Sequence, residues 1–247
     1  MASQRLFFFH NPKAAGSSII DSIGSLWPHL HRAPHIAHTI QENVRTGGDY
    51  NRFKGYDLYI GHYSREVFDA VNNGHAYITN FRYPVARVLS LYNYFRNGPP
   101  PQKRFTQDEI IDFYCVDAAK TMDFGEFARS RDPRILIYTN DAHFRQLTSS
   151  QWVLDAPATN IDNACAFIDD ALCFYVCEYP DLSAAWFRER LGLTEIAERN
   201  VTRNAFGYVG IEEVDDASYE AILEINQRDL AIYRHAVKRL LERGIFT

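Results

Sequence analysis

The stretch LFFFHNPKAAGSSII, residues 6–20, contains the pattern that decides the fold of this chain. Residues 6–9 form a continuous apolar run, which is typical of a strand buried on both faces, and the Asn11-Pro12 pair that follows indicates a turn. Small and hydroxyl residues then precede apolar residues at helical spacing, namely Ile19, Ile20, Ile23 and Leu26. The stretch therefore predicts a strand, a tight loop and a helix.

The same alternation recurs along the chain. Three further runs have the composition of buried strands: residues 57–60, 76–81 and 172–178. Helical periodicity follows each of them, and the last helix is predicted as continuous from about Ser218 to Arg243. Alternating strands and helices imply an α/β fold of three layers, in which a mostly parallel sheet is flanked by helices. We expect one domain over residues 1–247.

Composition restricts the class of protein. The chain has 247 residues, of which 46% are apolar and 23% charged, so it can build a large core. Its net charge of -5 disfavours nonspecific binding to nucleic acid. No window approaches the ~20 apolar residues of a membrane span, the four cysteines show no CxxC spacing, and no secretory signal is evident. We therefore expect a cytoplasmic protein with no nucleic-acid partner and no membrane span.

The loop over residues 10–18 has the parts of an anion-binding cradle. Small residues let backbone N–H groups approach a ligand, Lys13 and two serines add charge and hydroxyls, and the N-terminus of a helix favours negative charge. The loop is not a Walker A motif, because Lys13 precedes Gly16 by three positions. The alternative is a strand-to-helix turn that needs small residues only for packing.

A second constellation follows the strand over residues 76–81. The stretch FRYPVARVLSLY, residues 81–92, places Arg82 at the end of the strand and Ser90 on the next helix, which Pro84 can begin without losing a needed N–H. Arg82 and Ser90 could hold one phosphate group. The alternative is a salt-bridged arginine and a solvated serine.

Together the two motifs resemble the nucleotide-binding signatures of sulfotransferases that use 3'-phosphoadenosine 5'-phosphosulfate (PAPS), particularly the carbohydrate-type and bacterial branch. PKAAGSS, residues 12–18, is similar to the loop that holds the 5'-phosphosulfate in this family, and residues 81–92 are similar to its 3'-phosphate stretch. Residues 140–147, 198–204 and 229–233 follow in the usual order of the family, so the resemblance covers nearly the whole chain. It implies the P-loop NTPase-like sulfotransferase fold.

The resemblance also implies residue roles. Lys13 would contact the oxygen that bridges sulfate and 5'-phosphate and would stabilise the charge that develops on the leaving group. The other implied contacts are Ala15, Gly16, Ser17 and Ser18 for the 5'-phosphate, Arg82 and Ser90 for the 3'-phosphate, and Arg203 in a loop over the nucleotide. In two positions the chain departs from the family: Ala14 replaces a common threonine, and Tyr83 replaces a common aspartate, so that any capping role of that acid would be lost.

His62, just after the strand over residues 57–60, resembles the base histidine of carbohydrate-type members. A neutral imidazole can take a proton from an acceptor hydroxyl, whereas the alternative is a histidine that merely bonds a loop carbonyl. We expect no metal, because the histidines at positions 29, 31, 35 and 38 have neither cysteines nor a carboxylate pattern beside them.

The activity implied is transfer of a sulfuryl group from PAPS to a hydroxyl of a small-molecule or glycan acceptor. Adenosine 3',5'-bisphosphate (PAP) would be the other product. Two alternatives stay open from the sequence: a nucleotide-dependent kinase with a variant phosphate loop, and a noncatalytic module that binds a nucleotide or a sulfated glycan.

Overall fold

The computed structural model describes residues 5–33, 49–97, 107–150, 152–155, 160–193, 196 and 207–244. Within these residues the sheet has four strands, all parallel: β1 (Leu6–Phe9), β2 (Leu58–Gly61), β3 (Ala76–Phe81) and β4 (Cys173–Val176). Their spatial order is β2-β1-β3-β4. The predicted α/β fold with a parallel sheet is confirmed, and the bounds of each strand lie within two residues of the predicted ones.

The helices of the described chain connect and cover these strands. They are α1 (Gly16–Leu26), α3 (Arg65–Val71), α4 (Pro84–Arg96), α5 (Gln107–Thr121), α6 (Phe124–Arg129), α7 (Pro133–Thr139), α8 (Ala142–Thr148), α9 (Ile161–Asp169), α10 (Pro180–Leu191), α11 (Asp216–Ile225) and α12 (Gln227–Gly244). Proline occupies the first helical position of α4, α7 and α10, where its missing N–H has no partner to lose. Gly192 ends α10 at a φ of 74°, as a left-handed cap requires.

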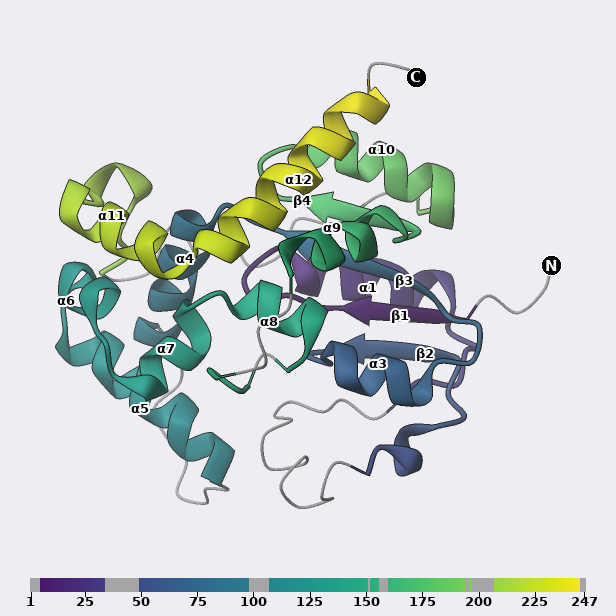
Figure 1. The fold of residues 1–247 in the computed structure, drawn as a ribbon, viewed down its shortest axis with the longest axis horizontal. Helices are drawn as coiled ribbons and strands as arrows, with labels where there is room; N and C mark the ends of the chain where they lie inside the picture. The colour runs from purple at the N-terminus through teal and green to yellow at the C-terminus, as the bar shows by residue number, and fades with distance from the viewer. Residues whose placement is uncertain are drawn as a thin grey trace.

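Alternate side chains of β1 divide the core into the layers of the fold. Phe7 and Phe9 pack into a cluster with α3, α8, α9 and α12, whereas Leu6 and Phe8 pack into a cluster with α1 and α10. All four side chains are fully buried. Figure 1 shows the resulting arrangement, with α8 and α12 in front of the strands and α1 behind them. The three layers predicted from the sequence are therefore present.

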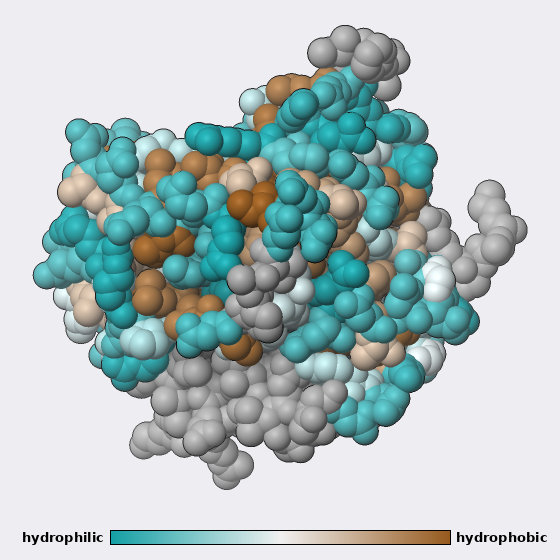
Figure 2. Space-filling model, viewed as in Figure 1, coloured by the Kyte–Doolittle hydropathy of each residue, from teal (hydrophilic) through white to brown (hydrophobic). Residues whose placement is uncertain are grey.

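A helical lobe lies beyond the carboxyl ends of the strands. Helices α4, α5, α6, α7 and α11 pack around a third apolar cluster. The arrowheads of β1 and β4 point toward this lobe in Figure 1. In Figure 2 the face of α12 is largely hydrophilic, and apolar atoms over the lobe occur in small groups separated by polar ones. No helix of the described residues combines the length and the apolar character needed to cross a membrane.

The prediction of one long C-terminal helix is wrong, because the chain breaks between α11 and α12. Asn226, at φ -124° and ψ 33°, separates the two helices and is fully buried. Its Oδ1 accepts a hydrogen bond from the N–H of Asp141 at 3.0 Å, and its Nδ2 donates to the carbonyl oxygen of Ile222 at 2.8 Å. The apolar stripe continues on both sides of the break, so periodicity does not reveal it.

Replacing Asn226 by alanine should lower the free energy of unfolding by about 1–3 kcal/mol, because the N–H of Asp141 would stay buried without its acceptor. Urea unfolding followed by circular dichroism measures this. The matched control is Gln227→Ala, which removes an exposed amide bonded to the carbonyl oxygen of Leu223 and should cost less than about 0.5 kcal/mol. Equal losses in the two variants would contradict the account.

Candidate functional site

The topology of the sheet switches direction between β1 and β3, and the region just beyond the carboxyl ends of these two strands is called the crevice here. The chain leaves β1 toward β2 on one side, and it leaves β3 toward β4 on the other side. Such a switch point is where ligands bind in open parallel sheets. Residues 10–15 follow β1 and residues 82–84 follow β3, so the two motifs that the sequence singled out meet at this crevice.

The side chain of Asn80 holds the loop after β1. Its Oδ1 accepts from the N–H of Asn11 at 2.8 Å, and its Nδ2 donates to the carbonyl oxygens of Asn11, at 3.1 Å, and Ala14. Both asparagines are buried, at 0% and 1% exposure. A residue of β3 thereby fixes the start and the end of the loop, and no motif of the sequence indicates this role.

Two residues of the loop have left-handed backbone conformations. Lys13 has a φ of 66° and Ala15 a φ of 65°. A residue with a Cβ pays roughly 1–2 kcal/mol for this region, so the surrounding contacts must hold it there. Arg82 contributes one such contact, because its Nη1 donates to the carbonyl oxygen of Lys13 at 3.1 Å. The N-terminus of α1, which begins directly after Ala15, has neither a capping side chain nor an acidic residue in its first turn.

Lys13 and Arg82 bring two positive charges together. The pKa of Lys13 is lowered from 10.5 to about 8, mainly by burial of its ammonium group and further by the charge of Arg82. In the described part of the chain, neither side chain forms an ion pair with a carboxylate. A bound anion would relieve both the desolvation and the repulsion.

His62 stands at the carboxyl end of β2 with a defined orientation. Its Nδ1 lies 3.0 Å from the carbonyl oxygen of His10, which can only accept, so Nδ1 carries the hydrogen of this bond. The ring stacks on that of His10, with centroids 4.4 Å apart. Gln146 donates to the same carbonyl of His10 at 3.1 Å and to that of Tyr63 at 3.0 Å. The loop-carbonyl bond considered for His62 is present.

Gly16 packs too closely against His10 to leave room for a larger residue. A Cβ at this position would lie 1.9 Å from Cδ2 and Nε2 of His10, whose ring is 8% exposed and stacks on Phe8 and His62. Ser17 is exposed at the start of α1, whereas Ser18 is buried. A small residue is thus needed for packing at Gly16, as the alternative interpretation of the loop expects. Ser17 stays accessible at the N-terminus of α1.

The remaining predicted contacts are placed less directly. Ser90 is half-buried on α4, and no contact in the described structure joins it to Arg82. Arg203 lies outside the described residues, as do His35 and His38 of the histidine-rich segment. In the described residues, no three His, Cys, Asp or Glu side chains come together as a metal site would need.

A carboxylate from another element bonds the backbone at the start of α4. The main-chain N–H of Tyr83 donates to Oε1 of Glu178 at 2.9 Å, so a carboxylate that follows β4 serves the helix that follows β3. Tyr83 itself provides no side-chain cap, as expected from the loss of the aspartate at this position, and the carboxylate comes from another element. The sequence does not reveal the replacement because Glu178 is 95 residues away.

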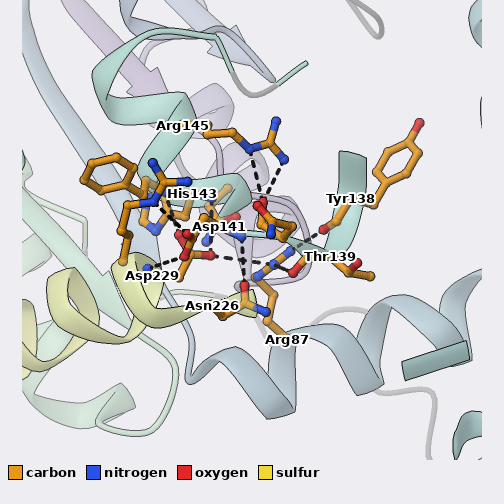
Figure 3. Close-up of polar contacts among 12 residues, drawn as sticks. Arg87, Tyr138, Thr139, Asp141, His143, Arg145, Asn226 and Asp229 are labelled. Carbon is orange, nitrogen blue, oxygen red and sulfur yellow. Dashed lines mark hydrogen bonds and ion pairs between the residues drawn. The ribbon is translucent and has the colours of Figure 1, made fainter. Parts of the chain in front are cut away.

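A buried polar network anchors α4 behind the crevice (Figure 3). Arg87 is 1% exposed and donates to the carbonyl oxygens of Tyr138, at 2.9 Å, and Thr139, at 3.3 Å. Its Nη2 also lies 3.6 Å from Oδ2 of Asp229 on α12. The guanidinium group of Arg87, which shares a helix with Ser90, is therefore engaged by carbonyl and carboxylate groups of the protein itself.

Helices α8 and α12 cap each other within the same network. Asp229 accepts from the N–H of Phe144 at 2.7 Å and from that of His143 at 3.4 Å, at the start of α8. Asp141, just before α8, accepts in turn from the N–H of Asp229 at 2.9 Å. Burial raises the pKa of Asp229 from 3.8 to about 6, and the charge of Arg87 opposes that effect. The crossed caps lock the two helices to one another, as Figure 3 shows.

The sequence matches no model of a protein family, and a search of curated proteins finds no match. The case for a function consequently depends on the residues at the crevice.

Replacing Gly16 by alanine should lower the free energy of unfolding by about 1–3 kcal/mol, because the new methyl group displaces the ring of His10. The double variant Gly16→Ala/His10→Ala should be less destabilised than the sum of its single variants, since the methyl group then occupies vacated space. Gly24→Ala is the matched control in the same helix. It has no neighbour within 4 Å and should be neutral or stabilising. Additive losses in the double variant would refute the contact in urea unfolding experiments.

Proposed function

We propose that the protein is a sulfotransferase that moves a sulfuryl group from PAPS to a hydroxyl of a small-molecule or carbohydrate acceptor. The observation that carries the proposal is the pairing of Lys13 and Arg82, two cations without carboxylate partners in the described structure, at the switch point of a parallel sheet. His62, oriented by His10, supplies a base at the neighbouring strand end. The resemblance of both loops to the PAPS signatures selects this ligand from among polyanions.

The nucleotide would bind through the loop and α1. Backbone N–H groups at Ala15, Gly16 and Ser17 and the hydroxyl of Ser17 face the 5'-phosphate in this proposal, at a helix end that has no cap of its own. Arg82 and Ser90 take the 3'-phosphate, and Arg203 and the Ser18 hydroxyl complete the proposed contacts. Lys13 would contact the bridging oxygen, where negative charge grows during transfer.

The transfer itself needs a base and a cation. Nε2 of His62 accepts the proton of the acceptor hydroxyl, while the hydroxyl oxygen forms a bond to sulfur. The bond from sulfur to the bridging oxygen breaks, and its electron pair stays on the departing phosphate, which Lys13 stabilises. Atoms and charge balance without a further reactant, and the products are a sulfate ester and PAP. Positioning and charge stabilisation do most of the work, as in phosphoryl transfer.

Ligand binding and sulfate transfer together test the proposal. PAP at 100 times its dissociation constant should stabilise the protein by about 2.7 kcal/mol, seen as a rise in melting temperature. Radiolabelled sulfate from PAPS should appear in one or more members of an acceptor panel. Lys13→Ala and His62→Ala should each lower the transfer rate by roughly 10²–10³-fold.

Lys54→Ala and His29→Ala are matched controls, because both residues are exposed and lie outside the proposed site. Both should retain the full rate. Stabilisation by ATP with Mg²⁺ but not by PAP would favour the kinase alternative. Binding of PAP without transfer to any acceptor would favour a noncatalytic module.

The affinity for PAP should depend on pH through Lys13. Its pKa is about 8 in the free protein, and a bound polyanion raises it, so binding takes up a proton above pH 8. The association constant should therefore fall by up to about tenfold per pH unit above pH 8, where the phosphates of PAP are already ionised. Calorimetry between pH 7.5 and 9.5 measures it. The slope should vanish in Lys13→Met and persist in Lys54→Met; an unchanged slope in Lys13→Met would count against the assignment.

A further inference from the structure

Tyr94 on α4 contacts the ammonium group of Lys13. The Nζ atom lies 4.1 Å from the centroid of the tyrosine ring. Tyr94 is 53% exposed, although α4 buries most of its large apolar side chains in the lobe. Its ring packs against Phe95, with centroids 5.7 Å apart and planes at 53°. Packing in the core does not explain a tyrosine at this place.

The contact with Tyr94 gives the ammonium group of Lys13 a favourable electrostatic interaction. Burial and the charge of Arg82 both disfavour the protonated amine. Among the described residues no carboxylate pairs with it, so the face of the Tyr94 ring is its favourable electrostatic contact. The left-handed backbone of Lys13 and the hydrogen bond from Arg82 fix the main chain from which the side chain extends. The ring of Tyr94 contacts the ammonium group at the other end of that side chain.

We propose that Tyr94 is a positioning residue that docks the Lys13 ammonium in the crevice and keeps it charged until an anionic ligand takes over. That the ligand is a nucleotide whose leaving phosphate receives this ammonium rests on the proposed function. The docking itself depends only on the ring and the amine. The ring face, and not the phenol hydroxyl, carries the role.

Titration of Lys13 by NMR tests the docking directly. The chain has only five lysines, so protein labelled with ¹³C-lysine gives few Cε signals, and the signal missing in Lys13→Met identifies Lys13. Tyr94→Leu should lower the pKa of Lys13 by roughly one pH unit, because the ring no longer favours the cation. Tyr94→Phe keeps the ring face and should leave the titration unchanged.

A control variant separates this contact from general effects of losing a tyrosine. Tyr114→Leu removes a ring that lies 3.4 Å from Cζ of Arg134, and it should not move the Lys13 titration. Tyr94→Leu with an unchanged Lys13 titration would overturn the proposal. So would a Tyr94→Phe variant that shifts the titration as much as Tyr94→Leu does.

PAP binding gives a second readout. Tyr94→Leu should bind PAP about eightfold more weakly than the unmodified protein at pH 8.5, but less than about twofold more weakly at pH 6.5, where Lys13 is charged in both proteins. A loss of equal size at both pH values would contradict the role in keeping the ammonium charged. If the unmodified protein does not bind PAP at all, the proposed function fails, while the NMR titration still decides whether Tyr94 docks Lys13.

Discussion

The hydrogen bonds of the Asn80 side chain are the constraint on which the rest of the site depends. One amide group at the end of β3 bonds the loop after β1 both at Asn11 and at Ala14. Between these two points the backbone adopts the left-handed conformation of Lys13, and Ala15 follows with another. Neither residue is a glycine, so this path is stable only because buried polar partners satisfy it. The direction of Lys13 into the crevice follows from that path.

A second constraint joins the helical lobe to the layered part of the fold. Arg87 belongs to α4 in the lobe, whereas Asp229 belongs to α12, which covers the sheet. A buried ion pair is a weak net stabiliser, since the cost of desolvating both charges offsets their attraction. Its consequence here is geometric. The orientation of α4 relative to the sheet determines where Tyr94 stands, and with it the place at which the ammonium of Lys13 docks.

The sequence predicts the strands, the loop and the meeting of Lys13, Arg82 and His62 at one edge, because each depends on local pattern and on the parallel topology. It does not predict contacts made by residues distant in the chain. Asn80 offers a weak signal, as a polar residue in a buried strand, but its partners lie 66 to 69 positions away. Helices α7 and α8 have seven residues each, too few for a periodic pattern. The apolar stripe continues on both sides of Asn226, so the sequence pattern does not indicate that the helix ends there. The hydrogen bond between Asn226 and Asp141 explains the break.

The orientation of His62 bears on the choice between the proposed transferase and a module that only binds anions. The strained loop, the uncapped start of α1 and the two cations would all be relieved by a bound polyanion, and binding alone would account for them. An oriented imidazole is not needed for that relief. Its orientation comes from the carbonyl of His10, three residues before Lys13 in the same loop. The backbone segment that carries Lys13 therefore also carries the carbonyl that orients His62. In the proposed sulfotransferase, this segment would place both the base that takes the acceptor's proton and the cation that stabilises the charge on the leaving group.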